Sequence, residues 1–315
     1  MTDADSRTGR ESGLGTTVHV ERDLGGRRGR VTIDRPEVLN ALDRATLVAL
    51  REAFLDLAAD LRVGVVVLTG AGDRAFSTGA DLAEQEAFLA RPNDYWAWMG
   101  TFIDAIDAIR DCPKPVLARL NGIVVGGGNE LNLACDLAVA ADDIHIRQIG
   151  TSRGSIPAGG ATQWLPITVG DRRAREIFFL NRPIPAAQAL DWGLVNRVVP
   201  RAELDATVDE LSGQLLEKLP ETLRAAKAQV QIWKDFAWAM TIRHAREWLT
   251  IHAGSPEVAE GLRTFREKTV PDYDAIRDGL AETGTAQVVR PCPSCGRGVG
   301  VSDATFCPYC GSALG

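Results

Sequence analysis

Four cysteines near the C-terminal end have the spacing of a metal site. Cys292 and Cys295 lie in CPSCG, and Cys307 and Cys310 lie in CPYCG. Each Cys-x-x-Cys turn directs two thiolates toward one point, and two such turns complete a tetrahedral site of four sulfurs. No coordination position stays open in such a site, so the metal is expected to be structural. A rubredoxin-like iron site has the same ligands, but the absence of another redox signature favours zinc.

A second group with chemical potential is the segment GGGNEL, in which three glycines precede Glu130. Glycines at 126–128 allow the backbone to approach a ligand closely, and a helix beginning here adds a partial positive charge. A strand-to-helix turn that needs glycine only for its geometry would explain the same letters. Glu130 falls in the first helical turn, where a carboxylate can move a proton or can simply be stabilised by the helix dipole.

The elements around these residues alternate between strand and helix patterns. TTVHVERD and RGRVTIDRP read as strands joined at the Gly25–Gly26 turn, and GVVVLTG reads as a buried strand. DRATLVALREAFLDLAADL has apolar residues at helical spacing, with Asp43 as the N-cap. Helical patterns also cover Leu82 to Asp111. Beyond Pro200 the strand signal stops and residues 202–282 read as helical. The pattern predicts an α/β fold with helices outside sheets.

Composition restricts the function classes. The 315 residues include 35 basic and 42 acidic ones, a net charge of −7, which argues against a general nucleic-acid binder. No apolar run is long enough for a membrane span, and the first residues lack the apolar part of a signal peptide, so we expect a cytoplasmic protein. Residues 1–16 are polar and rich in Gly and Ser, which predicts a disordered tail.

Several segments, in order over residues 17–282, resemble the crotonase superfamily, the enoyl-CoA hydratase/isomerase family. They are RPEVLNALDRATLVALREAF, AFSTGADL, PKPVLARLNGIVVGGGNELNLACDLAVAADD and SPEVAEGLRTFREKTVPDY. The resemblance implies a crotonase-type spiral of ββα units over residues 17–200. It also implies a C-terminal helical trimerisation region over 201–283, and a homotrimer or hexamer. A linker, 284–290, would then lead into a zinc ribbon over 291–315 that docks a partner protein or caps the end.

The same resemblance assigns roles to individual residues. Enolate chemistry places negative charge on the thioester oxygen, and preorganised backbone N–H donors stabilise that charge. The family's two donor loops match GADL and GGGNEL, which puts the donors at Ala80 and Gly127, with Glu130 as general acid/base. CoA would be part of the substrate, and no redox cofactor is implied. The residues implied to contact CoA are Arg35, Asn40, Ala41, Asp81 and Leu82.

One loop departs from the typical hydratase pattern. HIRQIGTSRGSIPAGGATQWLP has Gly150 where typical hydratases carry a second glutamate. The loop resembles the naphthoate synthases, in which bicarbonate can occupy the vacated space as a base. It also resembles the 6-oxocyclohex-1-ene-1-carbonyl-CoA hydrolases, which add water to a cyclic enoyl-CoA. By this resemblance Gln148, Gly150 and Ser155 line the reacting end of the pocket, and Tyr95 lies over it.

Three hypotheses follow from these residues. The first is a hydratase or hydrolase that adds water to an enoyl-CoA, a cyclic one included. The second is a C–C bond-forming or isomerising enzyme similar to the naphthoate synthases. The third is a catalytically weak acyl-CoA-binding module whose ribbon recruits a partner.

Overall fold

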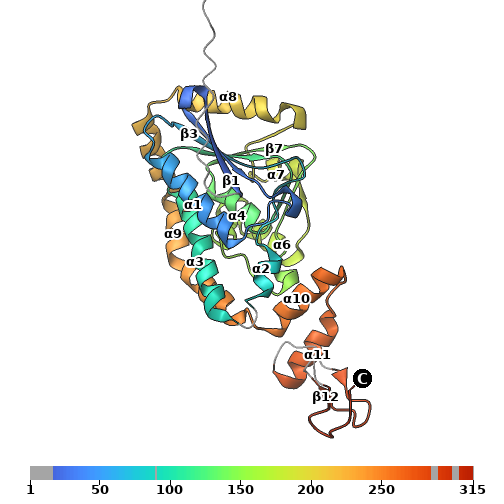
Figure 1. Cartoon of the computed structure of the whole chain (residues 1–315). Coiled ribbons are helices and arrows are strands. Elements are labelled where there is room, and N and C mark those ends of the chain that lie inside the picture. Colours follow the sequence, from blue (N-terminus) through green and yellow to red (C-terminus); the bar gives the residue numbers. More distant parts are fainter. Residues whose placement is uncertain (1–16, 89–90, 285–289, 300–304, 315) are drawn as a thin grey trace, which may run out of the picture.

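The computed structural model describes residues 17–88, 91–284, 290–299 and 305–314 (Figure 1). The predicted tail, 1–16, lies outside the described residues, as do positions 285–289 of the predicted linker. Within the described ranges, none of the helices has the length and hydrophobicity that a membrane span requires.

The described residues of the main body form two sheets. The larger has the order β1-β2-β3-β5-β7-β10, with β1 and β2 antiparallel and the other neighbours parallel. Its strands are β1 (Val18–Asp23), β2 (Arg28–Ile33), β3 (Val65–Gly70), β5 (Val116–Leu120), β7 (Leu137–Ala141) and β10 (Arg197–Val199). The smaller has the order β4-β6-β8-β9. Its strands are β4 (Ala75–Ser77), β6 (Ile123–Val125), β8 (His145–Arg147) and β9 (Ile184–Pro185).

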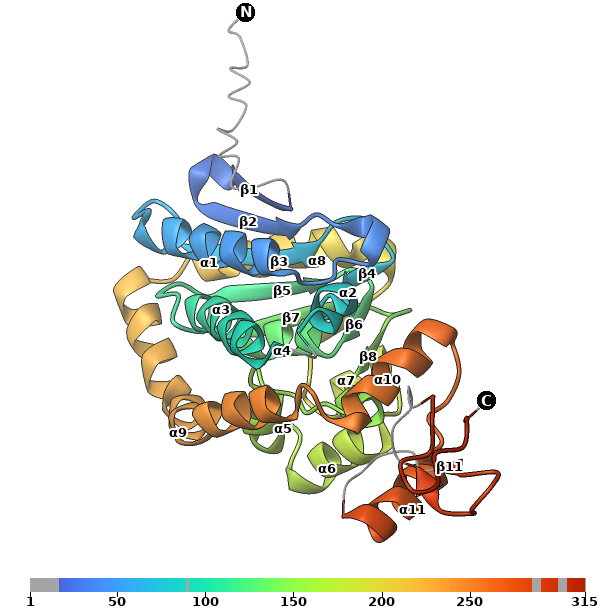
Figure 2. The ribbon, with the colours of Figure 1, turned by 60° about the horizontal axis from the view of Figure 1, so that its bottom comes forward.

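From β3 to β8, consecutive strands alternate between the two sheets, and helices follow each pair. The chain passes from β3 to β4, from β5 to β6 and from β7 to β8, each time leaving the larger sheet for the smaller one. The strands of the larger sheet lie side by side with helices around them (Figure 2). The predicted spiral of ββα units is therefore confirmed.

The helices surround this pair of sheets. They are α1 (Arg44–Ala59), α2 (Leu82–Glu86), α3 (Pro92–Arg110), α4 (Gly127–Ala134), α5 (Ala161–Thr168), α6 (Asp171–Leu180), α7 (Ala186–Asp191), α8 (Leu204–Leu216), α9 (Pro220–His252), α10 (Pro256–Glu267) and α11 (Tyr273–Thr283). Short 3-10 turns accompany them: η1 (Leu24–Gly26), η2 (Pro36–Val38), η3 (Gly150–Arg153) and η4 (Arg201–Glu203).

Local sequence signals account for several element boundaries. The Asp43 side chain accepts a hydrogen bond from the amide of Thr46 at 2.8 Å, which confirms the predicted N-cap of α1. The helical segment predicted from Leu82 to Asp111 is two helices, because α3 starts afresh at Pro92. Pro220 and Pro256 likewise begin α9 and α10, since proline fits the first turn of a helix but not its interior.

The cysteine-rich end is a separate small unit. It contains β11 (Arg290–Pro291) and β12 (Gly298–Val299), which pair antiparallel. Its small buried cluster consists of Cys292, Val299 and Cys307 with Leu314 against them, apart from the main core. In both views of the ribbon this unit lies beside α11 (Figures 1 and 2).

The helix α10 lies across one end of the body, against η3. A Cβ atom on Gly261 of α10 would lie 2.4 Å from the carbonyl oxygen of Arg153, and one on Gly154 would lie 2.5 Å from that of Glu257. Two glycines therefore allow the backbones of η3 and α10 to touch. This contact closes one side of a cavity of about 690 Å³.

Candidate active site and metal centre

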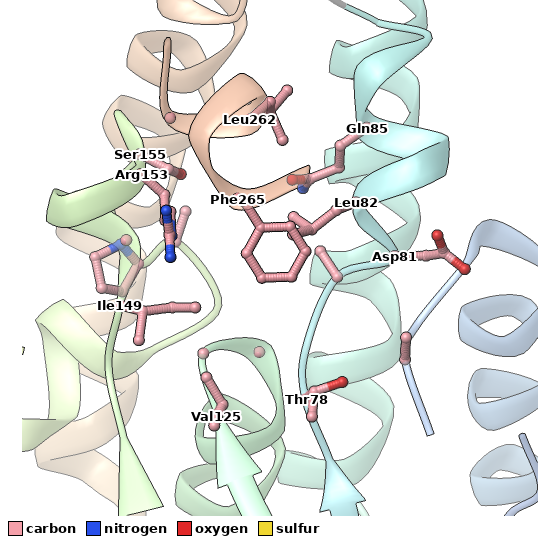
Figure 3. A pocket seen from close by; sticks show the side chains of 18 of the residues that line it. Thr78, Asp81, Leu82, Gln85, Val125, Ile149, Arg153, Ser155, Leu262 and Phe265 are labelled. Atoms are coloured by element: carbon pink, nitrogen blue, oxygen red, sulfur yellow. The ribbon is translucent and has the colours of Figure 1, made fainter. Parts of the chain in front are cut away.

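A cavity of about 690 Å³ lies between the carboxyl end of the small sheet and the helices α3 and α10. Much of its wall is apolar, and the side chains of Phe265 and Leu262 on α10 point into it (Figure 3). Its other lining residues come mainly from the loop before α1, the loop after β4, α2, α3, the start of α4, the loop after β8 and the end of α9. Such a partly enclosed, largely apolar pocket is typical of a small-molecule site.

The hydrogen bonds of its loop fix the direction of the Ala80 amide. Leu42 donates its N–H to the carbonyl of Gly79 at 2.8 Å, and Asp81 donates its N–H to the carbonyl of Leu42 at 3.0 Å. The N–H of Ala80 belongs to the same peptide unit as the carbonyl of Gly79, and the two groups point in opposite directions. Because that carbonyl is bonded to Leu42, the N–H of Ala80 is directed away from Leu42. Ala80 itself lines the cavity.

The amide of Gly127 borders the same space. Gly127 is the first residue of α4, where helical N–H groups have no partner within the helix. A Cβ atom on Gly127 would lie 3.6 Å from the nitrogen of Ala80, and one on Gly79 would lie 2.6 Å from the nitrogen of Gly127. The two predicted donor loops therefore touch, and within the described part of the chain neither amide has a hydrogen-bond partner.

Glu130 lines the cavity from the first turn of α4 and is buried. Its Oε1 accepts hydrogen bonds from the amides of Gly159, at 2.6 Å, and Ala161, at 3.2 Å. Burial raises the pKa of Glu130 to about 7, although these two amides act in the opposite direction. The carboxyl group can therefore both accept and release a proton near neutral pH.

The second carboxylate of a typical hydratase is absent from its position, as the sequence predicts. Gly150 lines the cavity, and a Cβ atom on it would lie 3.0 Å from the carbonyl oxygen of Ser155. Gln148 is buried and donates a hydrogen bond to the carbonyl of Gly126 at 3.4 Å, so it supports the glycine turn. The hydroxyl of Ser155 donates to the carbonyl of Ile156 at 3.4 Å and lies at the cavity wall.

Aromatic side chains of α3 form another wall that sequence reasoning largely missed. Tyr95 and Trp98 stack with ring centroids 6.2 Å apart, and Trp98 stacks on Phe102 at 5.7 Å. All three line the cavity. Burial, together with the nearby charge of Glu130, raises the pKa of Tyr95, so its phenol stays protonated and can only donate a hydrogen bond or accept one as a neutral group. Only Tyr95 was predicted here.

The residues predicted to contact CoA separate into two groups. Ala41, Asp81 and Leu82 line the cavity. Arg35 and Asn40 lie outside its lining: Arg35 pairs with Asp81 at 3.1 Å and with Asp43 at 3.2 Å. The fully buried Asn40 side chain binds the backbone of the neighbouring loops, including the carbonyl of Ala75 at 2.8 Å. Both residues therefore hold the cavity wall in place.

The four cysteines form a cluster whose sulfur atoms all lie within 4.8 Å of one another. Cys292 Sγ is 3.7 Å from Cys310 Sγ, and Cys295 Sγ is 3.8 Å from Cys307 Sγ. All four are free thiols, and a set of four sulfur donors in such a cluster fits one tetrahedral metal ion. This cluster can therefore hold a metal, as the Cys-x-x-Cys spacing predicts.

Comparison with known proteins agrees with this geometry. The family model for enoyl-CoA hydratase/isomerase matches residues 29–275. A solved enoyl-CoA hydratase from Mycobacterium avium subsp. paratuberculosis K-10 is 28% identical, with a TM-score of 0.74 over 82% of this chain and 98% of its own. An enoyl-CoA hydratase from Bacillus anthracis is 30% identical, with a TM-score of 0.67 over 82% of this chain and 99% of its own. An enoyl-CoA hydratase/isomerase from Xanthobacter autotrophicus Py2 is 29% identical, with a TM-score of 0.73 over 84% of this chain and 96% of its own.

These matches cover both the sheets and the loops that border the cavity. The protein has the crotonase fold, an α/β architecture whose members are generally enzymes that process CoA thioesters. It belongs to the enoyl-CoA hydratase/isomerase family.

Proposed function

We propose that this protein adds water to the double bond of an enoyl-CoA. The observation that carries the proposal is the buried carboxyl group of Glu130, whose pKa of about 7 lets it take up and release a proton. The same cavity is lined by Ala80 and Gly127, whose amides are unpaired among the described residues. The carboxylate oxygen Oε2 accepts no hydrogen bond from the described residues, so it is free to bind water.

The amides of Ala80 and Gly127 act as the oxyanion hole. The thioester oxygen binds between them, and they stabilise the negative charge that develops there as the enolate forms. The N-terminus of α4 adds its partial positive charge at the same place. Losing one such donor typically lowers a rate about 100- to 1,000-fold.

Glu130 carries the proton from one substrate atom to another. Its carboxylate removes a proton from water while the oxygen of that water bonds to C3, and the electron pair of the double bond moves to the enolate oxygen. The enolate then collapses, and C2 takes the same proton from the Glu130 carboxyl group. One water is consumed, and Glu130 returns to its starting state.

The remaining predicted residues take supporting roles in this proposal. Ala41, Asp81 and Leu82 contact the pantetheine and adenine side of CoA, and Arg35 and Asn40 position that wall. Gln148 fixes the carbonyl of Gly126 next to the oxyanion hole. Ser155 and the neutral phenol of Tyr95 offer hydrogen bonds to water or to a ring carbonyl of a cyclic substrate.

A second candidate reaction is carbon–carbon bond formation or isomerisation of the naphthoate-synthase kind. The observation that favours it is Gly150 at the cavity wall, where an external bicarbonate could act as the base. Stimulation of turnover by added bicarbonate would support this reaction over simple hydration. A third candidate is an acyl-CoA-binding module without useful catalysis, whose zinc ribbon docks a partner protein.

Incubation with linear, aromatic and alicyclic enoyl-CoAs tests these proposals, with mass spectrometry to detect a gain of one water. We expect Glu130→Gln to lower kcat about 100- to 10,000-fold, the usual contribution of a general acid/base, and to leave the Kd of a saturated acyl-CoA within about threefold. A low wild-type rate that Glu130→Gln does not change, with CoA esters still bound, would instead support the binding module.

A further inference from the structure

Arg153 brings an unpaired positive charge to the cavity. It ends η3 and lines the cavity wall, and its Nε is shielded from solvent without a hydrogen-bond partner. The guanidinium carbon lies 5.2 Å from the ring centroid of Phe265. A cation–π contact of this kind uses the positive charge but supplies no acceptor for the N–H groups. The Nη groups of this guanidinium make no hydrogen bond or ion pair within the described residues, so their N–H donors remain available to a ligand.

Three carboxylates of the cavity lining and of α10 have partners other than Arg153. Asp81 pairs with Arg35 at 3.1 Å, and Glu260 of α10 pairs with Arg263 at 2.7 Å. Glu130 accepts hydrogen bonds through Oε1 from the backbone amides of Gly159 and Ala161. In the described ranges, no ion pair includes Arg153.

Other basic residues of the lining differ from Arg153. Arg147 donates its Nε–H to the carbonyl of Asn181, and His252 is hydrogen-bonded through Nδ1 to the carbonyl of Trp248 at 2.9 Å. Arg74 is exposed to solvent. Arg153 therefore combines partial burial with N–H groups that are free to bind.

The backbone of Arg153 packs closely against α10. Its carbonyl oxygen touches α10 at Gly261, at a place where even a Cβ atom would lie 2.4 Å away. Gly154, with a φ of 71°, turns the chain at this contact and touches the backbone of Glu257. This contact places the start of the Arg153 side chain beside α10, and the guanidinium of Arg153 contacts the ring of Phe265 on the same helix.

The position of Arg153 separates it from the wall proposed for CoA. In Figure 3, Arg153 and Ile149 lie on one side of the cavity, and Asp81 and Thr78 lie on the opposite side. If CoA runs along the Asp81 side and its thioester oxygen binds at Gly127, the acyl group extends toward the η3 side. Arg153 then faces the acyl group and not the phosphates of CoA.

We propose that the substrate's acyl group carries a carboxylate and that Arg153 binds it. This inference rests on the proposed function, because it assumes an acyl-CoA with its thioester at Ala80 and Gly127. A guanidinium binds a carboxylate through two parallel N–H···O bonds, which neither an alkyl chain nor a phenyl ring can accept. The substrate class is therefore an ω-carboxyacyl-CoA, and Arg153 is a specificity-determining residue.

Calorimetric titration of the metal-loaded full chain with matched saturated acyl-CoAs tests this proposal. The pairs are succinyl- with butyryl-CoA, glutaryl- with pentanoyl-CoA, and pimeloyl- with heptanoyl-CoA. A hydrogen bond to a charged group predicts that the carboxylated member of at least one pair binds about 10- to 100-fold tighter to the wild type. Arg153→Met should abolish this preference and Arg153→Lys should keep part of it. Arg27→Met, which removes one positive charge from the exposed β1–β2 turn, should leave it intact.

Two outcomes would overturn the proposal. One is that the wild type binds both members of every pair with equal affinity. This measurement uses the wild type alone and so does not depend on whether a variant folds. The other outcome is that Arg153→Met weakens the binding of both members of each pair and of free CoA equally, and leaves the binding of 3′-dephospho-CoA unchanged. That result would mean that Arg153 binds a CoA phosphate. These ligands are saturated, so the result stands independently of turnover. A failure of all enoyl-CoAs to gain water would contradict the proposed reaction but not this binding preference.

Discussion

At the scale of single residues, the site depends on how burial and hydrogen bonding act against each other at Glu130. The low dielectric of the interior disfavours the charged carboxylate, while the amides of Gly159 and Ala161 favour it. The balance places the pKa at about 7. An exposed glutamate in water would be ionised at neutral pH and would be a weak proton donor, so the tertiary environment gives this side chain the pKa that its proposed role requires.

The same environment gives a pH-dependent contribution to stability. The pKa of Glu130 is raised from 4.5 to about 7, so between these pH values the folded chain keeps a proton that the unfolded chain has lost. Relative to Glu130→Gln, the free energy of unfolding of the wild type should therefore fall by on the order of 3 kcal/mol as the pH rises from about 4.5 to about 7. Urea unfolding of both proteins between about pH 4 and pH 8 measures this difference. Parallel stability curves for the two proteins would contradict the assignment.

At the scale of elements, the site depends on the contact between the loop after β4 and the start of α4. Gly128 of α4 packs directly on β4, where a Cβ atom would lie 2.2 Å from the carbonyl oxygen of Ser77. Gly79 has a φ of 82° and lies against Gly127. Both contacts need glycine, and together they set the distance between the two proposed donor amides.

Gly79→Ala should therefore damage the oxyanion hole. Its Cβ atom would lie 2.6 Å from the nitrogen of Gly127, and the positive φ adds strain, so the two loops must separate. We expect kcat to fall at least about 100-fold, the effect of losing one donor. Steady-state kinetics, with thermal unfolding to check the fold, measures this.

Gly213→Ala on α8 is the matched control for this prediction. No atom lies within 4 Å of the added Cβ, and the position is inside a helix, so the change should raise stability by up to about 1 kcal/mol and leave kcat unaltered. Normal turnover by Gly79→Ala would mean that the two amides do not act together.

At the scale of the whole molecule, two hydrophobic clusters of very different size share one chain. The main core includes residues from both sheets of the main body and from most helices, whereas the C-terminal unit buries little besides two of its own cysteines, Val299 and Leu314. Such a small cluster cannot offset the conformational entropy lost on folding, so we predict that a bound metal ion stabilises it.

Removal of the metal should therefore unfold the C-terminal unit alone. We expect one zinc ion per chain, lost on treatment with a strong chelator or in Cys310→Ser, with turnover and the main thermal transition preserved. Cys112→Ala, which alters a buried cysteine outside the cluster, should keep the zinc. Metal analysis and calorimetry test this, and a collapse of the main transition on chelation would show that the two units fold together.

The exposed apolar face of α9 gives a prediction about assembly. Val230, Trp233, Phe236 and Met240 are 80%, 70%, 63% and 68% exposed, at helical spacing. A large apolar patch of this kind usually marks a protein interface, and we predict that it holds a homotrimer or hexamer together. Trp233→Glu should lower the mass seen in sedimentation to that of a single chain. Leu61→Glu, which changes a residue that lies outside α9 and is 97% exposed, should leave the mass unchanged. A wild type that sediments as a monomer would contradict the prediction.

Much of this protein follows from short-range sequence patterns. The spacing of the four cysteines, the glycines at 126–128, the N-cap at Asp43 and the alternation of strands and helices each depend on residues close in the chain, so the sequence alone determined them. The roles of Ala80, Gly127 and Glu130 came from resemblance and remain proposals.

Only the tertiary structure decided which distant residues share the cavity. It placed Arg153 opposite Asp81, closed the pocket with Phe265 of α10, and buried Asn40 in the wall where the sequence predicted a CoA contact. The direction and burial of a side chain depend on elements that pack against it from far along the chain. Neither residue type nor local spacing contains that information.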